Sequence, residues 1–540
     1  MSKKKARQKE ERIKEESKAV AIETREADIS EHSWFIASLI IVVFGAILRC
    51  YDLALKPFHH DEGVNGHFMI RLVREGIYKY DPENYHGPTI YYFSLVAAKL
   101  FGLNTVAMRL VPALFGIATI WLLLCLRRYI GSIGALVAAA LIAVSPGAIY
   151  LSRYFIHETL FIFFTLGIIV AALYYYETAK LVYSVLGSIS AALLFATKET
   201  AFISIGVILL AWACVVVYLK LVNNGLPWET KEQAKARKRE LDQATKKVFF
   251  EKLGDQNNLI THLLIAVSVF LLVYVLFYSS FFTNNKGVWD SLQAFQIWAK
   301  TSSKDHTQSG PFAYFSWLKD EELPLMVLCA TGFLIALWRA RNRFAIFAGA
   351  WAIGITAAYS IIKYKTPWLA LNFLVPMAIV GGYCVDQLGL LSKQIEKRVF
   401  SGLVLLIALG VGIYQAISIN FYHYDDDKYP YIYAHTPRQF LDMVREFEKY
   451  AKRAQGTKEE LSVSVVSPDY WPLPWYTRDY KGVGYHGGMT TISNQHIVIA
   501  KDEQRYQLDE LIGSRYTLIG EYPLRPGVNL LLYVRSDLMQ

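Results

Sequence analysis

Charged residues are scarce in this sequence. Asp, Glu, Lys and Arg make up 19% of its 540 residues, against the roughly 25% typical of soluble globular proteins, and 54% of the residues are hydrophobic. The mean hydropathy is +0.26, which excludes a disordered scaffold and an ordinary soluble enzyme. The hydrophobic residues gather in runs of roughly 18–22 residues, the length that crosses a ~30 Å hydrocarbon layer. The sequence therefore predicts a polytopic α-helical membrane protein.

Cysteine is also rare, and all five cysteines lie in or at the edge of apolar runs. This placement is typical of small hydrophobic residues and indicates neither a disulfide framework nor a metal knuckle. The C-terminal region has no glycine-rich phosphate-binding fingerprint, which argues against a dinucleotide site there. The cysteines are Cys50, Cys125, Cys214, Cys329 and Cys384.

The net charge of +10 does not indicate a nucleic-acid partner, because the basic clusters abut the ends of apolar runs. This is the positive-inside pattern of membrane proteins. No small-residue cleavage site closes the first apolar run, which predicts a retained anchor after a cytoplasmic tail at 1–32. The other clusters are Arg127–Arg128, 231–247, Arg339–Arg343 and Lys393–Arg398.

With the basic loops placed inside, the hydrophobic runs predict about eleven helices in a membrane domain at 33–418. An odd number of spans places the C-terminal region on the opposite side from the cytoplasmic N-terminus. The predicted spans are 34–53, 106–126, 131–150, 157–177, 182–197, 201–221, 259–280, 323–338, 343–361, 368–387 and 399–418.

The run at 88–103 is apolar enough to be taken for a further span. Counting it would place the later basic clusters outside, so we interpret it as an amphipathic helix in the membrane interface. The outer side then contains loops 54–105 and 281–322 and a C-terminal region at 419–540, and a charged loop at 224–258 is cytoplasmic. In the C-terminal region, helical stretches at 437–455 and 506–512 alternate with strand-like segments at 462–466, 496–500, 516–520 and 529–534. This alternation predicts a small α/β domain.

Three acidic residues are candidate catalytic groups. Asp61 and Glu62 follow the first span at the membrane–water boundary, where partial desolvation raises a carboxyl pKa and suits it to act as a general base. Glu158 lies in the short outer turn before the fourth span, where acids are often paired or functional. The alternatives are solvated loop carboxylates and, for Glu158, an acid that complements a helix N-terminus.

Several basic side chains and two histidines also lie on the predicted outer side. Lys198, Lys363 and Lys365 occur where the positive-inside rule disfavours them, which indicates an anionic ligand such as a lipid phosphate; the alternative is snorkelling to lipid headgroups. His86 and His306 precede similar aromatic helix starts, but their spacing does not form a local metal-binding motif.

These residues lie in motifs that resemble the GT-C membrane glycosyltransferases of the protein O-mannosyltransferase and ArnT-like superfamily, with closest resemblance to the flippase-associated glycosyltransferase-like branch. The resemblance covers about 34–418 in order. Its motifs are HHDEG, HGPTIYYFSLVAAKLFG, AMRLVPALFGIATIWLLLCLRRYIG, RYFIHETLFIFF, LLFATKETAF, the H-x-x-x-x-P-F-x-Y-F segment at 306–315 and KTPW, with DYWPLPWYTRDY in the C-terminal region.

The resemblance implies an inverting transfer of a sugar from a polyprenyl-phosphate carrier to an extracytoplasmic acceptor, by a multi-pass enzyme of the plasma (inner) membrane. It implies Asp61 as the general base, with Glu62 beside it and Glu158 as the second acid. It also implies a divalent metal ion at His86 and His306, although the family has an acid at the first of these positions. The family's basic residue after the acidic pair is replaced by Val64 and Asn65. The carrier phosphate is therefore assigned to Arg153, Lys198, Lys363 and Lys365.

Two other functions remain open at this point: a lipid-linked sugar flippase or transporter, and a non-catalytic subunit of an envelope glycan assembly. Transporters often contain internal repeats or helices broken at matching midplane positions. The sequence shows no repeat, and its candidate polar residues lie at outer helix ends, which favours an interfacial enzyme.

Overall fold

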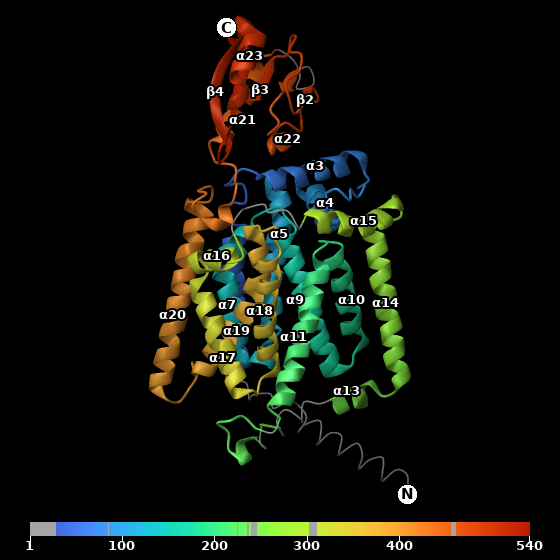
Figure 1. The fold of residues 1–540 in the computed structure, drawn as a ribbon, viewed down its shortest axis with the longest axis vertical. Helices are drawn as coiled ribbons and strands as arrows, with labels where there is room; N and C mark the ends of the chain where they lie inside the picture. The colour runs from blue at the N-terminus through green and yellow to red at the C-terminus, as the bar shows by residue number, and fades with distance from the viewer. Residues whose placement is uncertain are drawn as a thin grey trace.

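A computed structural model describes residues 29–539, except for 85, 224, 235–236, 239–245, 302–309 and 455–460. Within these residues, eight helices are long and apolar enough to cross a membrane. They stand side by side as a bundle (Figure 1). They are α2 (Glu31–Cys50), α5 (Thr105–Leu124), α9 (Glu158–Thr178), α11 (Ala201–Leu221), α14 (Gln256–Tyr278), α18 (Arg343–Ile361), α19 (Leu371–Leu388, after a 3-10 turn at Pro367–Ala370) and α20 (Ile395–Ile417).

Two further apolar segments are broken, so the described residues have up to ten spans where the sequence predicted eleven. Helices α7 (Ser132–Val144) and α8 (Pro146–Ser152) bend by 62° at a proline, which cannot donate the helical hydrogen bond. Helices α16 (Ala313–Glu321) and α17 (Leu323–Arg339) bend by 109°. The remaining predicted span is α10 (Leu181–Phe195), whose 15 residues cover only ~22 Å at 1.5 Å per residue.

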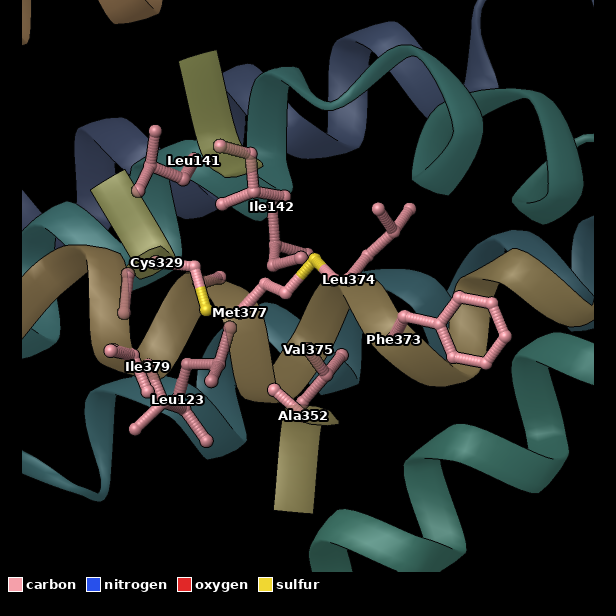
Figure 2. Close-up of a cluster of buried hydrophobic side chains, with 14 of the residues drawn as sticks. Leu123, Leu141, Ile142, Cys329, Ala352, Phe373, Leu374, Val375, Met377 and Ile379 are labelled. Carbon is pink, nitrogen blue, oxygen red and sulfur yellow. The ribbon is translucent and has the colours of Figure 1, made fainter. Parts of the chain in front are cut away.

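Helix α19 forms the centre of the bundle, and almost all of its side chains are buried. It packs against α7, α17 and α18. Figure 2 shows this core: Leu374 and Met377 of α19 lie near Ile142 of α7, and Ile379 lies near Leu123 of α5. Because residues on every side of α19 are buried, the helices around it shield it from lipid.

Short helices gather at the end of the bundle that faces the C-terminal domain (Figure 1). They are α3 (His60–Glu75), α4 (Thr89–Phe101) and α15 (Lys286–Thr301). Helix α13 (Lys246–Leu253), from the loop predicted to be cytoplasmic, lies at the other end. The helix predicted at 88–103 is confirmed as α4, which buries one face (Ile90, Tyr91, Ser94) and exposes Leu100 and Phe101. A further short helix, α6 (Arg127–Ile130), lies between α5 and α7.

The C-terminal region forms the predicted small α/β domain. Its sheet has the order β2-β1-β3-β5-β4, in which β1 pairs parallel to β2 and β3, and β5 pairs antiparallel to β3 and β4. Four strands match the sequence predictions, and the three-residue β2 was not predicted. The elements are α21 (Phe440–Arg453), β1 (Val463–Val465), α22 (Leu473–Tyr476), β2 (Val483–Tyr485), β3 (Ile497–Lys501), α23 (Arg505–Ile512), β4 (Tyr516–Arg525) and β5 (Val528–Arg535).

Alternation along β3 explains why helices cover both faces of this sheet. Ile497 and Ile499 belong to one apolar cluster with Phe447 of α21, whereas Val498 belongs to a second cluster with Leu508 of α23. Successive side chains of a strand point to opposite faces. The domain therefore has two small cores and stands on the bundle at the end where α3 lies (Figure 1).

Candidate active site

A pocket of about 240 Å³ is formed by several segments of the chain, and these segments meet at the end of the bundle nearest the C-terminal domain (Figure 1). Its walls come from six segments: the start of α3, the residues before α4, the start of α9, the turn between α10 and α11, Trp298 of α15, and the stretch from the end of α18 to the 3-10 turn before α19. Among its lining residues are Asp61, His86, Glu158, Lys198 and Glu199. The structure thus brings four of the predicted site residues together from segments far apart in the sequence.

Asp61 lies in the first turn of α3, and its position is fixed by a capping arrangement. The Asp61 N–H donates to Nδ1 of His59, the residue that caps the helix, at 3.0 Å. The Asp61 side chain is 38% exposed and opens on the pocket. Burial of the site raises the pKa of Asp61 to about 6; Glu158 and Glu62 act in the same direction, while His86 and Lys198 oppose them. A carboxyl group with this pKa is ionised at neutral pH and can accept a proton.

Glu62, the next residue, is fully buried and does not line the pocket. Its two carboxylate oxygens accept hydrogen bonds from the Arg109 guanidinium at 2.7 and 2.6 Å. They also accept from the N–H groups of His59 at 3.0 Å and Phe155 at 2.8 Å. With its acceptor sites occupied, Glu62 holds α3 against α5 and the α8–α9 connection. Sequence position alone could not separate it from Asp61.

Glu158 begins α9 and forms a buried ion pair with Lys198 from the α10–α11 turn. Nζ of Lys198 lies 2.8 Å from Oε1 of Glu158. Burial lowers the pKa of Lys198, but the carboxylates of Glu158 and Glu199 outweigh this effect and hold that pKa above its usual value. Lys198 therefore stays charged in the pocket wall, where it lies beside Glu158.

Two further lining residues were not singled out from the sequence. Glu199 is buried, and its Oε2 lies 3.1 Å from Nδ1 of His86. His157 donates from Nε2 to the Gly87 carbonyl at 3.2 Å, and its ring lies 5.0 Å from the ring of His86. In the sequence, the only indication that Glu199 and His157 belong to the site is that they are adjacent to Lys198 and Glu158. Sequence reasoning gave no reason to prefer either.

The predicted metal ligands are not brought together within the described residues. His306 lies outside those residues, and His86 pairs with Glu199. Among the described residues, no group of three or more His, Cys, Asp or Glu side chains could hold a metal ion. Metal binding at His86 and His306 stays a prediction.

The other predicted phosphate ligands do not line the pocket. Arg153 turns toward the C-terminal end of α2, where its guanidinium donates to the carbonyl groups of Tyr51 and, at 2.9 Å, of Asp52. Lys365 is buried and donates to the Ile362 carbonyl at 2.6 Å. Lys363 is exposed. Lys198 is thus the one lysine or arginine in the pocket wall, as far as the described residues show.

Comparisons with known proteins bear on the fold of the chain. A family model described as dolichyl-phosphate-mannose-protein mannosyltransferase matches residues 85–228. A comparison with curated protein sequences finds no match. ArnT from Cupriavidus metallidurans in its apo state has a similar structure, with a TM-score of 0.59 and 15% identity over 94% of this chain and 99% of that chain. The same protein bound to undecaprenyl phosphate gives a TM-score of 0.58, again at 15% identity over 94% of this chain and 99% of that chain.

The likeness extends to an oligosaccharyltransferase. The Archaeoglobus fulgidus enzyme in its apo form gives a TM-score of 0.53 and 14% identity over 84% of this chain and 64% of that chain. These similarities do not distinguish the flippase-associated branch from the others. They show that the chain has the GT-C fold that its motifs predicted.

Proposed function

We propose that this protein is a membrane glycosyltransferase that moves a sugar from a polyprenyl-phosphate carrier to an acceptor on the side of the membrane where the C-terminal domain lies. Solved proteins of similar fold were crystallised with undecaprenyl phosphate or complexed with a dolichol phosphate. The observation that carries the proposal is the pocket, where Asp61 is partly exposed and has a raised pKa among acids that are already paired.

Comparison of the acids near the pocket favours Asp61 as the base. Glu62 is buried against Arg109, Glu158 accepts from Lys198, and Glu199 pairs with His86. A general base must reach the proton that it removes and must be unprotonated when it does so. Asp61 combines an opening on the pocket with ionisation near neutral pH.

The proposed step is a direct displacement. The acceptor oxygen attacks the anomeric carbon of the sugar from the face opposite the phosphate, and Asp61 takes the proton from that oxygen. The bond between the anomeric carbon and the phosphate oxygen breaks, and polyprenyl phosphate leaves with the electron pair. The configuration at the anomeric carbon inverts. The leaving group is already activated, so the protein supplies mainly one base, positioning and charge stabilisation.

The acidic lining suits this step, because positive charge develops on the sugar as the bond to phosphate breaks. Glu158 and Glu199 place two buried carboxylates in the pocket wall. Lys198 carries a positive charge next to these two carboxylates. We assign it to the carrier phosphate. Arg153, Lys363 and Lys365 are left out of this assignment because they do not line the pocket.

The test is an assay of purified protein in lipid vesicles with a panel of polyprenyl-phosphate sugars and a membrane extract as the acceptor source. The release of free carrier phosphate is measured, and transfer to the extract is followed with a labelled sugar. Turnover with at least one sugar is expected. Translocation of the intact lipid-linked sugar without release of carrier phosphate would instead support a flippase.

A further inference from the structure

Helix α3 lies between the pocket and the C-terminal domain. In a helix, successive residues turn by about 100°, so Asp61, Val64 and Asn65 share one face, and these three residues line the pocket. Gly63 and Gly66 lie on the opposite face. The pocket therefore contacts one side of α3, and another part of the molecule is free to contact the other side.

The opposite side is covered by the segment Trp471–Tyr476 of the C-terminal domain, which includes α22. A Cβ atom placed at Gly63 would lie 2.7 Å from Cα of Pro472, and one placed at Gly66 would lie 2.8 Å from Cε3 of Trp475. Both distances are shorter than real Cβ contacts, so only glycine allows the segment to lie this close to α3. No residue of the C-terminal domain lines the described pocket.

The same segment also holds the chain that leads into α3. The ring of Phe58 stacks on Trp475, with centroids 4.6 Å apart, and the Phe58 N–H donates to the Tyr476 hydroxyl at 2.9 Å. Phe58 and Trp475 are both fully buried, and the Trp475 indole N–H lies 3.3 Å from the Thr105 hydroxyl at the start of α5. Phe58 directly precedes His59, the residue that caps α3 and receives the Asp61 N–H.

A second contact reaches the pocket wall itself. Nη1 of Arg525, at the end of β4, lies 3.4 Å from Nδ1 of His60. The same guanidinium pairs with Asp469, which also lies 3.4 Å from Nζ of Lys501. The sheet of the C-terminal domain is thereby connected to the residue that precedes Asp61.

We infer that the C-terminal domain is a part of the catalytic apparatus, in which Trp475 and the Trp471–Tyr476 segment act as positioning residues that hold α3, and with it Asp61, at the pocket. This inference rests on the proposed function of Asp61. A misplacement of about 1 Å can cost an enzyme roughly 10²-fold in rate, so a close contact behind α3 is sufficient to control turnover.

The test changes the space between α3 and the C-terminal domain in the full-length protein. Gly66→Ala pushes a methyl group against the benzo ring of Trp475, and Trp475→Phe removes that ring, so the double variant should restore the space. Gly410→Ala is the matched control, because a Cβ there, in α20, meets nothing within 4 Å. Turnover, KM for the donor, the pH profile and thermal unfolding in detergent are measured for each variant.

We expect Gly66→Ala to lower kcat by about 10- to 100-fold with little change in KM, since the displacement concerns the base and not donor binding. The acidic midpoint of its pH profile should fall below the wild-type value, because a displaced Asp61 is better hydrated. The double variant should recover at least part of the wild-type kcat and of the wild-type pH midpoint. Gly410→Ala should match the wild type in both quantities.

The inference is overturned if Gly66→Ala keeps the wild-type kcat and pH midpoint. It is equally overturned if kcat falls while the midpoint stays fixed and Trp475→Phe brings no recovery, since the contact would then affect only folding. An Asp61→Asn variant in the same assay separates the two claims. If Asp61→Asn is fully active, the proposed role of Asp61 as the base is wrong. If Asp61→Asn is inactive while Gly66→Ala has wild-type kinetics, only the positioning role is wrong.

Discussion

Neighbouring carboxylates at the start of α3 have different environments, and this difference determines the chemistry. Asp61 opens on the pocket, while Glu62 is enclosed by donors from Arg109 and two backbone N–H groups. The sequence placed both residues at the membrane boundary and could not choose between them. The choice depends on a residue 47 positions away, which no local pattern reveals.

The pH dependence of turnover follows from the groups that surround Asp61. These are Glu62 on the same helix, Glu158 of α9, Lys198 of the α10–α11 turn and His86 before α4. Because the base acts in its ionised form, the rate should fall about tenfold per pH unit below the pKa of about 6. Glu158→Gln removes a charge that raises this pKa, so the acidic midpoint should move to lower pH. A midpoint that stays fixed or rises in this variant would show that another group limits the rate.

Lys198 should contribute mainly to carrier affinity. Loss of a charge-assisted hydrogen bond to a phosphate costs about 1.5–3 kcal/mol, so Lys198→Gln should weaken binding of polyprenyl phosphate by roughly 10- to 150-fold. Lys363→Gln is the control, since Lys363 is exposed and lies off the pocket. Binding can be measured by titration of protein in nanodiscs. Equal weakening in both variants would indicate a general surface-charge effect and no phosphate site at Lys198.

At the scale of secondary structure, the buried Glu62–Arg109 pair joins α3 to α5. Removing one partner of a buried ion pair costs about 3–5 kcal/mol, because the other charge is left uncompensated. Glu62→Gln should therefore lower the free energy of unfolding by about that amount. Glu75→Gln on the same helix is the control. Its partner Arg71 is as exposed as Glu75, at 46% each, and such surface pairs contribute about 0–1 kcal/mol. Denaturant unfolding in detergent micelles measures both variants, and equal losses would contradict the structural role of Glu62.

Hydrophobic periodicity and length predicted where helices lie, but not where they break or what the flanking cations do. The run at 131–150 contains Pro146, yet its apolar length suggested one continuous span; the structure divides it at Ser145. Arg153 follows directly, and it became a candidate phosphate ligand because the basic residue that the resemblance implies after Asp61 and Glu62 is missing. In the structure it donates to carbonyl groups at the end of α2, a favourable place for a cation at a helix C-terminus.

At the scale of the whole molecule, the sequence predicted the C-terminal α/β domain from alternating strands and helices, because those patterns are local. It did not predict the contact of this domain with α3, which depends on Trp475 meeting Gly66 over 400 residues away along the chain. The pocket likewise combines six segments, and before the structure only the resemblance to a known family connected five of them; it did not include Trp298 of α15.

The arrangement of the molecule predicts which residues face the same side of the membrane. Lys79, which follows α3, and Ser493, in the C-terminal domain, are both exposed. Single cysteines at these two positions should react with an impermeant thiol reagent on intact cells. A cysteine at Thr230, exposed in the loop after α11, should react only after the membrane is opened. The background is a variant in which the five native cysteines are replaced. Labelling of Thr230 alone on intact cells would reverse the orientation.

The role of Asp61 as the base of a glycosyl transfer is tested by the single-turnover rate of carrier-phosphate release by Asp61→Asn. Loss of a general base typically lowers the rate by about 10²–10⁴-fold, and this loss is expected with unchanged carrier binding. Since burial raises the pKa of Asp61 to about 6, the ionised group destabilises the fold increasingly as pH rises through that value. The variant should thus be at least as stable as the wild type at pH 7.5.

Asp427→Asn, at an exposed position beyond α20, is the matched control in this measurement and should release carrier phosphate at the wild-type rate. With the sugar that gives the fastest wild-type turnover, we expect Asp61→Asn to be folded but slow and Asp427→Asn to be fast. Release by Asp61→Asn at the wild-type rate would contradict it.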